Sequence, residues 1–145
     1  MKKILLLAGL LMSYQIQAGP HCQNVHLNGN YVMFQNSVSP ANPHTGRCEI
    51  EIKKGLAFGL CAFSVAPDGS VKPGFTGPVN GTASINPDCS VELSLDFSPA
   101  PNVTVQSDFE LQFTPDKNSF IGQWSNNFGL LGTTTGTRVK KDRHD

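Results

Sequence analysis

The residues that could carry acid–base or nucleophilic chemistry are few, and none of the histidines lies in a predicted strand. The histidines lie near the N-terminus (His21 and His26), in a proline-rich segment (His44) and in the C-terminal tail (His144). A Ser-His-Asp arrangement needs a histidine held inside a structured site. The chain also lacks the G-x-S-x-G and H-E-x-x-H motifs and a glycine loop of the phosphate-binding kind. The sequence therefore predicts no catalytic residue.

The carboxylates come in pairs that alternate with apolar residues. Glu92 and Asp96 share one strand face, and Asp108 and Glu110 share another. In a strand whose other face is buried, such side chains point to solvent. Acid–base catalysis would need buried carboxyl groups, and nothing in this pattern points inward. We predict that the protein is not an enzyme and binds no cofactor. An isomerase or cyclase active site in a barrel pocket is suggested only by analogy with the fold.

Aromatic residues are the stronger candidates for binding. Trp124 is the only tryptophan, and most of the nine phenylalanines fall in predicted strands. Large aromatic side chains usually form the core, and that interpretation stays open here. The alternative is that Tyr31, Phe58, Trp124 and Phe128 line the mouth of a cavity, with the asparagines at 126–127 as its polar rim.

The clearest structural element is the stretch from Gly77 to Phe97. Apolar residues mostly alternate with polar ones on either side of a turn at Asn86-Pro87-Asp88. Two runs of period two joined by turn residues are typical of a β-hairpin with one buried face. Cys89 has the parity of Val91 and is expected to face the core.

Similar segments follow one another along the chain. Besides the hairpin, the expected strands are Gly29–Phe34, Cys48–Ile52, Leu56–Val65, Val71–Phe75, 103–113, Phe120–Trp124 and Leu130–Val139. Leu56–Val65 is apolar on both faces, as a buried helix would be, but Gly59 and the turn that follows favour a strand. About eight short strands predict an all-β protein: an antiparallel up-and-down barrel or, alternatively, a β-sandwich.

The N-terminus has the features of an export signal. Two lysines precede the apolar run Ile4–Met12, and the segment ends on Ala18. This pattern is typical of a cleaved signal peptide, and its apolar run is too short to span a membrane as a stable helix. We predict a signal peptide at 1–18, one β-barrel domain at 19–139 and a flexible charged tail at 140–145. The protein would be secreted or periplasmic, and the short lysine-led signal suggests a bacterial exporter.

The charge balance excludes some partners. Export removes two of the 11 basic residues, so 9 remain against 11 acidic ones, a net charge of about −2. This balance predicts no nucleic-acid partner and no anionic membrane partner. The oligomeric state is left open.

The cysteines predict two disulfides. An even number of cysteines in an exported chain is typical of disulfides, and there is no C-x-x-C motif. Cys61 and Cys89 share parity with the apolar residues around them, so of the three connectivities we prefer Cys61–Cys89, with Cys22–Cys48 tethering the N-terminal segment. His21 and His26 flank Cys22 without a fixed geometry, and we predict no metal there.

The two ends of the domain carry a short pattern. The first strand opens with Leu27-Asn28-Gly29-Asn30-Tyr31, and the last contains the run from Gly132 to Val139. This pair resembles the calycin superfamily of lipocalin- and avidin-like barrels, in which a Gly-x-Trp motif packs against an arginine of the last strand. Gly29 and Tyr31 stand at the Gly-x-Trp positions, with Tyr in place of Trp, and Arg138 at the closing arginine. The resemblance implies an eight-stranded barrel with a cavity for a small ligand.

We therefore expect a secreted, non-catalytic binding protein that holds a small, largely apolar ligand in a barrel cavity. The alternative is a secreted protein-interaction module, an inhibitor or a host-facing factor, whose partner would be an extracellular protein. It would act through the loop Ser37–Arg47, because long loops are often functional.

Overall fold

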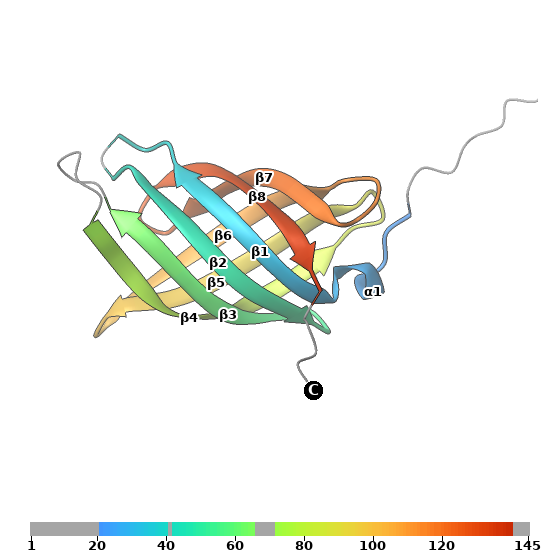
Figure 1. Ribbon diagram of the computed structural model, residues 1–145, viewed down its shortest axis with the longest axis horizontal. Helices are drawn as coiled ribbons and strands as arrows, with labels where there is room; N and C mark the ends of the chain where they lie inside the picture. The colour runs from blue at the N-terminus through green and yellow to red at the C-terminus, as the bar shows by residue number, and fades with distance from the viewer. Residues whose placement is uncertain (1–20, 41, 66–71, 141–145) are drawn as a thin grey trace, which may run out of the picture.

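A computed structural model describes residues 21–40, 42–65 and 72–140. Eight antiparallel strands form a closed barrel in which each strand pairs with its neighbours in sequence order, and β1 pairs with β8 (Figure 1). This confirms the all-β, up-and-down barrel, and it excludes the sandwich. The expected signal peptide (1–18) and most of the expected tail (141–145) lie outside the described residues, so both stay predictions.

The elements follow the chain with short connections. They are α1 Asn24–Leu27, β1 Gly29–Ser37, β2 His44–Lys53, β3 Leu56–Val65, β4 Lys72–Ile85, β5 Ser90–Ala100, β6 Val103–Phe113, β7 Ser119–Asn126 and β8 Leu131–Val139. We call the end with α1 and the β2–β3, β4–β5 and β6–β7 turns the closed end (Figure 1). The end with the β1–β2, β5–β6 and β7–β8 connections is the open end.

Two boundaries differ from those expected. The predicted loop Ser37–Arg47 is shorter, because β1 includes Ser37 and β2 begins at His44, whose neighbours at 45–47 pair with both β1 and β3. Both prolines of this segment precede β2, so neither has to donate a ladder hydrogen bond. The expected strand Val71–Phe75 is not separate, since β4 runs without a break from Lys72 to Ile85.

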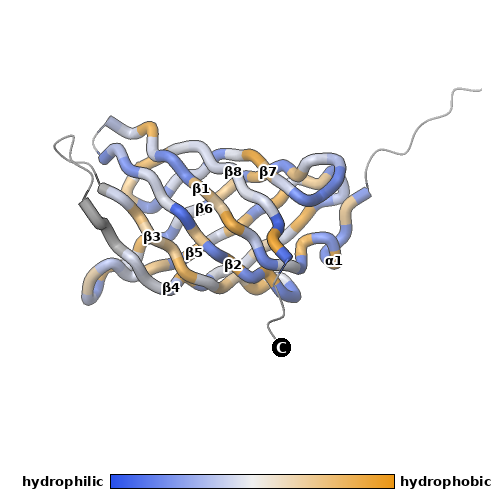
Figure 2. Tube along the Cα trace, in the orientation of Figure 1, coloured by the Kyte–Doolittle hydropathy of each residue, from blue (hydrophilic) through white to orange (hydrophobic). Residues whose placement is uncertain are grey.

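The alternating pattern builds the core. On β5 and β6 the apolar residues at odd positions are buried, from Val91 to Leu95 and from Val105 to Phe113, and most residues between them are exposed. Apolar and polar residues are interspersed along the strands of the chain trace (Figure 2). Side chains from all eight strands therefore fill most of the lumen, as expected for a barrel of this size.

Glycines on the inner face make room for aromatic rings. A Cβ atom at Gly136 would lie 2.1 Å from Cζ of Phe120, and one at Gly132 would lie 2.7 Å from Nε1 of Trp124. Each ring thus occupies the space that a side chain on β8 would fill. This explains why β8 has glycine at positions 132 and 136.

The structure corrects the predicted disulfides: the pairs are Cys22–Cys89 and Cys48–Cys61, not Cys61–Cys89 and Cys22–Cys48. Cys48 and Cys61 are direct partners in the β2–β3 register, with Cα atoms 4.0 Å apart. Cys89 lies in the β4–β5 turn at the closed end, where the backbone N–H of Cys22 donates to the carbonyl of Pro87 at 3.0 Å. All four cysteines are buried. The predicted partners Cys61 and Cys89 nevertheless lie at different levels along the barrel axis, because Cys61 is within β3 and Cys89 is in the turn at the closed end.

A polar cluster joins the first and last strands at the closed end. The hydroxyl of Tyr31 donates to the carbonyl of Leu27 at 2.9 Å and accepts a hydrogen bond from Nη2 of Arg138 at 2.7 Å. Arg138 also donates to the carbonyl of His26, and its guanidinium carbon lies 5.3 Å from the centre of the Tyr31 ring. A Cβ at Gly29 would lie 3.1 Å from Nε of Arg138. The structure thus brings Gly29, Tyr31 and Arg138 together.

This cluster predicts a specific pH response. Burial raises the pKa of Tyr31 above its ordinary value of 10.0, and the hydrogen bond and charge of Arg138 offset only part of that rise. The neutral phenol therefore stabilises the fold at pH values below the unfolded pKa, and this contribution is lost as pH rises through the folded pKa. Tyr31 is the only tyrosine after residue 18. In a protein that spans residues 19–145, tyrosinate absorbance should rise at a higher pH in buffer than in denaturant; coincident curves would contradict the burial effect.

Candidate ligand cavity at the open end

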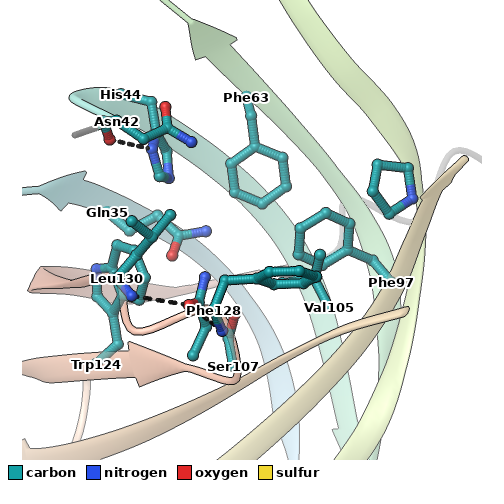
Figure 3. Close-up of a pocket in the computed structure, with 12 residues that line it drawn as sticks. Gln35, Asn42, His44, Phe63, Phe97, Val105, Ser107, Trp124, Phe128 and Leu130 are labelled. Atoms are coloured by element: carbon teal, nitrogen blue, oxygen red, sulfur yellow. Dashed lines mark hydrogen bonds between the residues drawn. The ribbon is translucent and has the colours of Figure 1, made fainter. Parts of the chain in front are cut away.

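A cavity of about 350 Å³ opens between the strands at the open end (Figure 3). Its apolar lining is Phe63, Phe97, Pro99, Val105, Trp124, Phe128 and Leu130, and its polar lining is Gln35, Asn42, His44, Ser107 and Asn126. These residues come from six strands and the two connections beside them. None of the described lining residues carries a carboxylate, an ammonium or a guanidinium group.

Aromatic rings form much of the wall. Phe63 and Phe97 are stacked, with ring centres 5.0 Å apart and planes inclined by 23°. The His44 ring lies edge-on to Phe63, with ring centres 6.0 Å apart, and is tilted by 49° to Trp124, with ring centres 5.8 Å apart. A Cβ at Gly46 would lie 2.6 Å from the Phe63 ring, so this glycine is what allows Phe63 to lie against β2.

Buried polar groups lie among these rings. Gln35 is 3% exposed, and its Nε2 donates to Sγ of Cys48 at 3.7 Å, a weak hydrogen bond. Ser107 is 6% exposed. Within the described chain, the buried Nε1 of Trp124 has no hydrogen-bond partner. Most buried polar groups are hydrogen-bonded, so the weakly bonded amide of Gln35 is the described group at this cavity that retains capacity to bind a ligand or water.

The tautomer of His44 follows from one contact. Its Nδ1 lies 3.0 Å from the backbone carbonyl oxygen of Asn42. A carbonyl oxygen can only accept, so Nδ1 carries the proton, and in the neutral ring Nε2 is left as an acceptor.

The β7–β8 connection positions the mouth. The side-chain oxygen of Asn126 accepts from the backbone N–H groups of Phe128 and Leu130, both at 3.0 Å. Asn127 connects the same segment to β6: its backbone N–H donates to the carbonyl of Gln106, and its side-chain oxygen accepts from the backbone N–H of Gln106. Phe128, which is 60% exposed, is therefore held at the rim rather than in the core.

The four predicted ligand residues separate into two groups. Trp124 and Phe128 line the cavity. Tyr31 lies at the closed end, where it contacts Arg138, and Phe58 is 42% exposed on the outer wall of β3. The sequence analysis did not predict that Gln35, His44, Phe63 and Phe97 line a cavity. A signal existed for Gln35, since it continues the inward parity of Tyr31 and Met33 as a polar residue.

The described residues contain no group of three or more His, Cys, Asp and Glu side chains that could hold a metal ion. In the same part of the chain, no helix has the length and apolar character needed to cross a membrane.

Comparison with known proteins gives a likeness of fold. No protein-family model matches the chain, and a search of curated proteins finds no match. Among solved structures, the chain is similar to a redesigned β-barrel, mFAP1, bound to DFHBI, with a TM-score of 0.52 and 11% sequence identity. The alignment covers 80% of this chain and 97% of that chain. The likeness shows the fold alone.

Proposed function

We propose that this protein is a secreted or periplasmic, non-catalytic binding protein with a calycin-like barrel that holds a small, largely apolar ligand at its open end. The aromatic-lined cavity carries this proposal. Its volume of about 350 Å³ lies near the lower end of small-molecule sites, roughly 300–1,000 Å³. The redesigned barrel of similar fold was solved bound to DFHBI. Two disulfides support a destination in an oxidising compartment.

The chemistry of the wall favours binding over catalysis. His44 is the one titratable side chain among the described lining residues. A barrel-pocket isomerase or cyclase would need a second proton-transfer group beside it. The interaction module through 37–47 gains no specific support, because residues 44–47 belong to the wall of the barrel.

The cavity hypothesis predicts a fluorescence response from Trp124, the only tryptophan. N-phenylnaphthylamine, a neutral apolar probe, should quench Trp124 saturably, with one probe per chain. Phe97→Ala should weaken binding about tenfold, because it removes one ring of the stacked pair and part of the apolar wall.

Phe58→Ala is the matched control, since it removes the same ring from the outer wall and should leave the affinity unchanged. Absence of saturable quenching, or an equal loss in both variants, would refute the cavity as the binding site. In that case, capture of an extracellular protein would become the better hypothesis.

A further inference from the structure

We infer that the ligand is a flat aromatic molecule without an anionic group, and that it carries a hydroxyl group that donates to Nε2 of His44 and accepts from the amide of Gln35. The inference rests on the proposed function and narrows its ligand class. It adds the polar group of the ligand, which the apolar wall of the cavity does not specify.

The shape of the ligand follows from the rings around the cavity. The stacked pair Phe63 and Phe97 lies on one side of the space, and Trp124 on the other (Figure 3). Aromatic side chains gain most from ligands that offer a ring face or edge. The volume of about 350 Å³ suits a molecule of a few rings.

Two neighbouring polar side chains of the cavity indicate that the ligand carries a hydroxyl group. His44 projects toward the space between Phe63 and Trp124, and in its neutral form Nε2 offers an acceptor (Figure 3). Gln35 pairs in register with Gly46, two residues from His44, and its amide points into the same space (Figure 3). Gln35 is 3% exposed, and the hydrogen bond that its amide makes within the described residues is the weak one to Cys48. A hydroxyl group can donate to one partner and accept from the other at once.

The lack of an anionic group follows from the absence of a cationic side chain among the described lining residues. An ionised carboxylate would lose its hydration among aromatic rings without gaining an opposite charge, which is strongly unfavourable. A neutral hydroxyl loses much less, because His44 and Gln35 replace its water partners.

A matched probe series tests this inference by calorimetric titration of the full mature protein. The probes are naphthol, methoxynaphthalene, naphthalene and naphthoate, which share one ring system and differ in the polar group. Naphthol should bind about tenfold more tightly than methoxynaphthalene or naphthalene, because only naphthol can donate. Naphthoate should bind more weakly than any neutral probe.

Two variants locate the effect. His44→Phe keeps a ring between Phe63 and Trp124 but removes the acceptor, so naphthol should lose its advantage over methoxynaphthalene. His44→Gln restores an acceptor and should recover part of that advantage. If a variant at position 44 does not fold, Gln35→Met serves instead, and it should reduce the preference for naphthol without weakening the binding of naphthalene.

The outcomes separate this inference from the proposed function. Equal affinities for naphthol and naphthalene in the natural protein, or a naphthol advantage that survives in His44→Phe, would overturn the hydroxyl inference while the cavity remains a binding site. Saturable binding of none of the four probes would overturn both.

Discussion

Replacing Cys22 and Cys89 by alanine is expected to lower the free energy of unfolding by about 4 kcal/mol. This disulfide joins residues 67 positions apart, whereas Cys48–Cys61 spans 13. A crosslink restricts the unfolded chain more when it closes a longer loop, and the chain-entropy relation gives roughly 4.4 and 2.9 kcal/mol for these two loops. The bridge at the closed end should therefore contribute more than the bridge inside the β2–β3 ladder.

Denaturant unfolding of three proteins that span residues 19–145 measures this difference: the natural sequence, Cys22→Ala with Cys89→Ala, and Cys48→Ala with Cys61→Ala. The second double variant is the matched control, because all four cysteines are buried and each variant loses the same atoms. A larger loss in the Cys48–Cys61 variant would show that local strain or packing, not loop length, sets the contribution. Peptide mapping under non-reducing conditions checks the pairing directly.

Arg138→Met is expected to lower the free energy of unfolding by about 2–4 kcal/mol. The substitution removes two charge-assisted hydrogen bonds, to the hydroxyl of Tyr31 and to the carbonyl of His26. It also removes the cation over the Tyr31 ring. These contacts connect β8 to β1 and to α1. The substitution therefore weakens the pairing of the first and last strands, which closes the barrel.

The control for Arg138 is Arg47→Met, the same substitution on the outer wall. Arg47 forms an ion pair with Glu49 at 2.6 Å, and the two side chains are 53% and 60% exposed. Exposed pairs of this kind contribute about 0–1 kcal/mol. Equal losses at the two positions would contradict a special role for the closed-end cluster. Tyr31→Phe, combined with Arg138→Met in a double-mutant cycle, isolates the energy of the contact between the two side chains.

The sequence predicted the fold because alternation specifies which residues face inward. On β5 and β6 the pattern is regular, and the number of such segments with short turns is enough to indicate an up-and-down barrel. The disulfides could not be paired in the same way. The alternation of inward and outward residues places Cys61 and Cys89 inside the barrel. It does not say where along the barrel axis each residue lies, and the two lie at different positions along that axis.

The candidate site was only partly predictable for a related reason. Alternation identifies the lining of the lumen but not the part of the lumen that stays empty, which depends on how inner side chains fill the space. Phe58 shows a second difficulty: β3 is apolar on both faces, and the structure buries Ala57 and Cys61 while Phe58 and Leu60 face outward.

The pairing of β8 with both β7 and β1 has a consequence for self-association. Because the ring closes through β8, β1 and β7 offer no unpaired edge to another molecule. A chain that ended before Leu131 would expose the backbone donors and acceptors of β1 and β7, and open edges of this kind recruit strands from other chains. The nine residues of β8 supply little apolar surface of their own. Their pairing nevertheless decides whether this sequence stays a discrete molecule or becomes a template for aggregation.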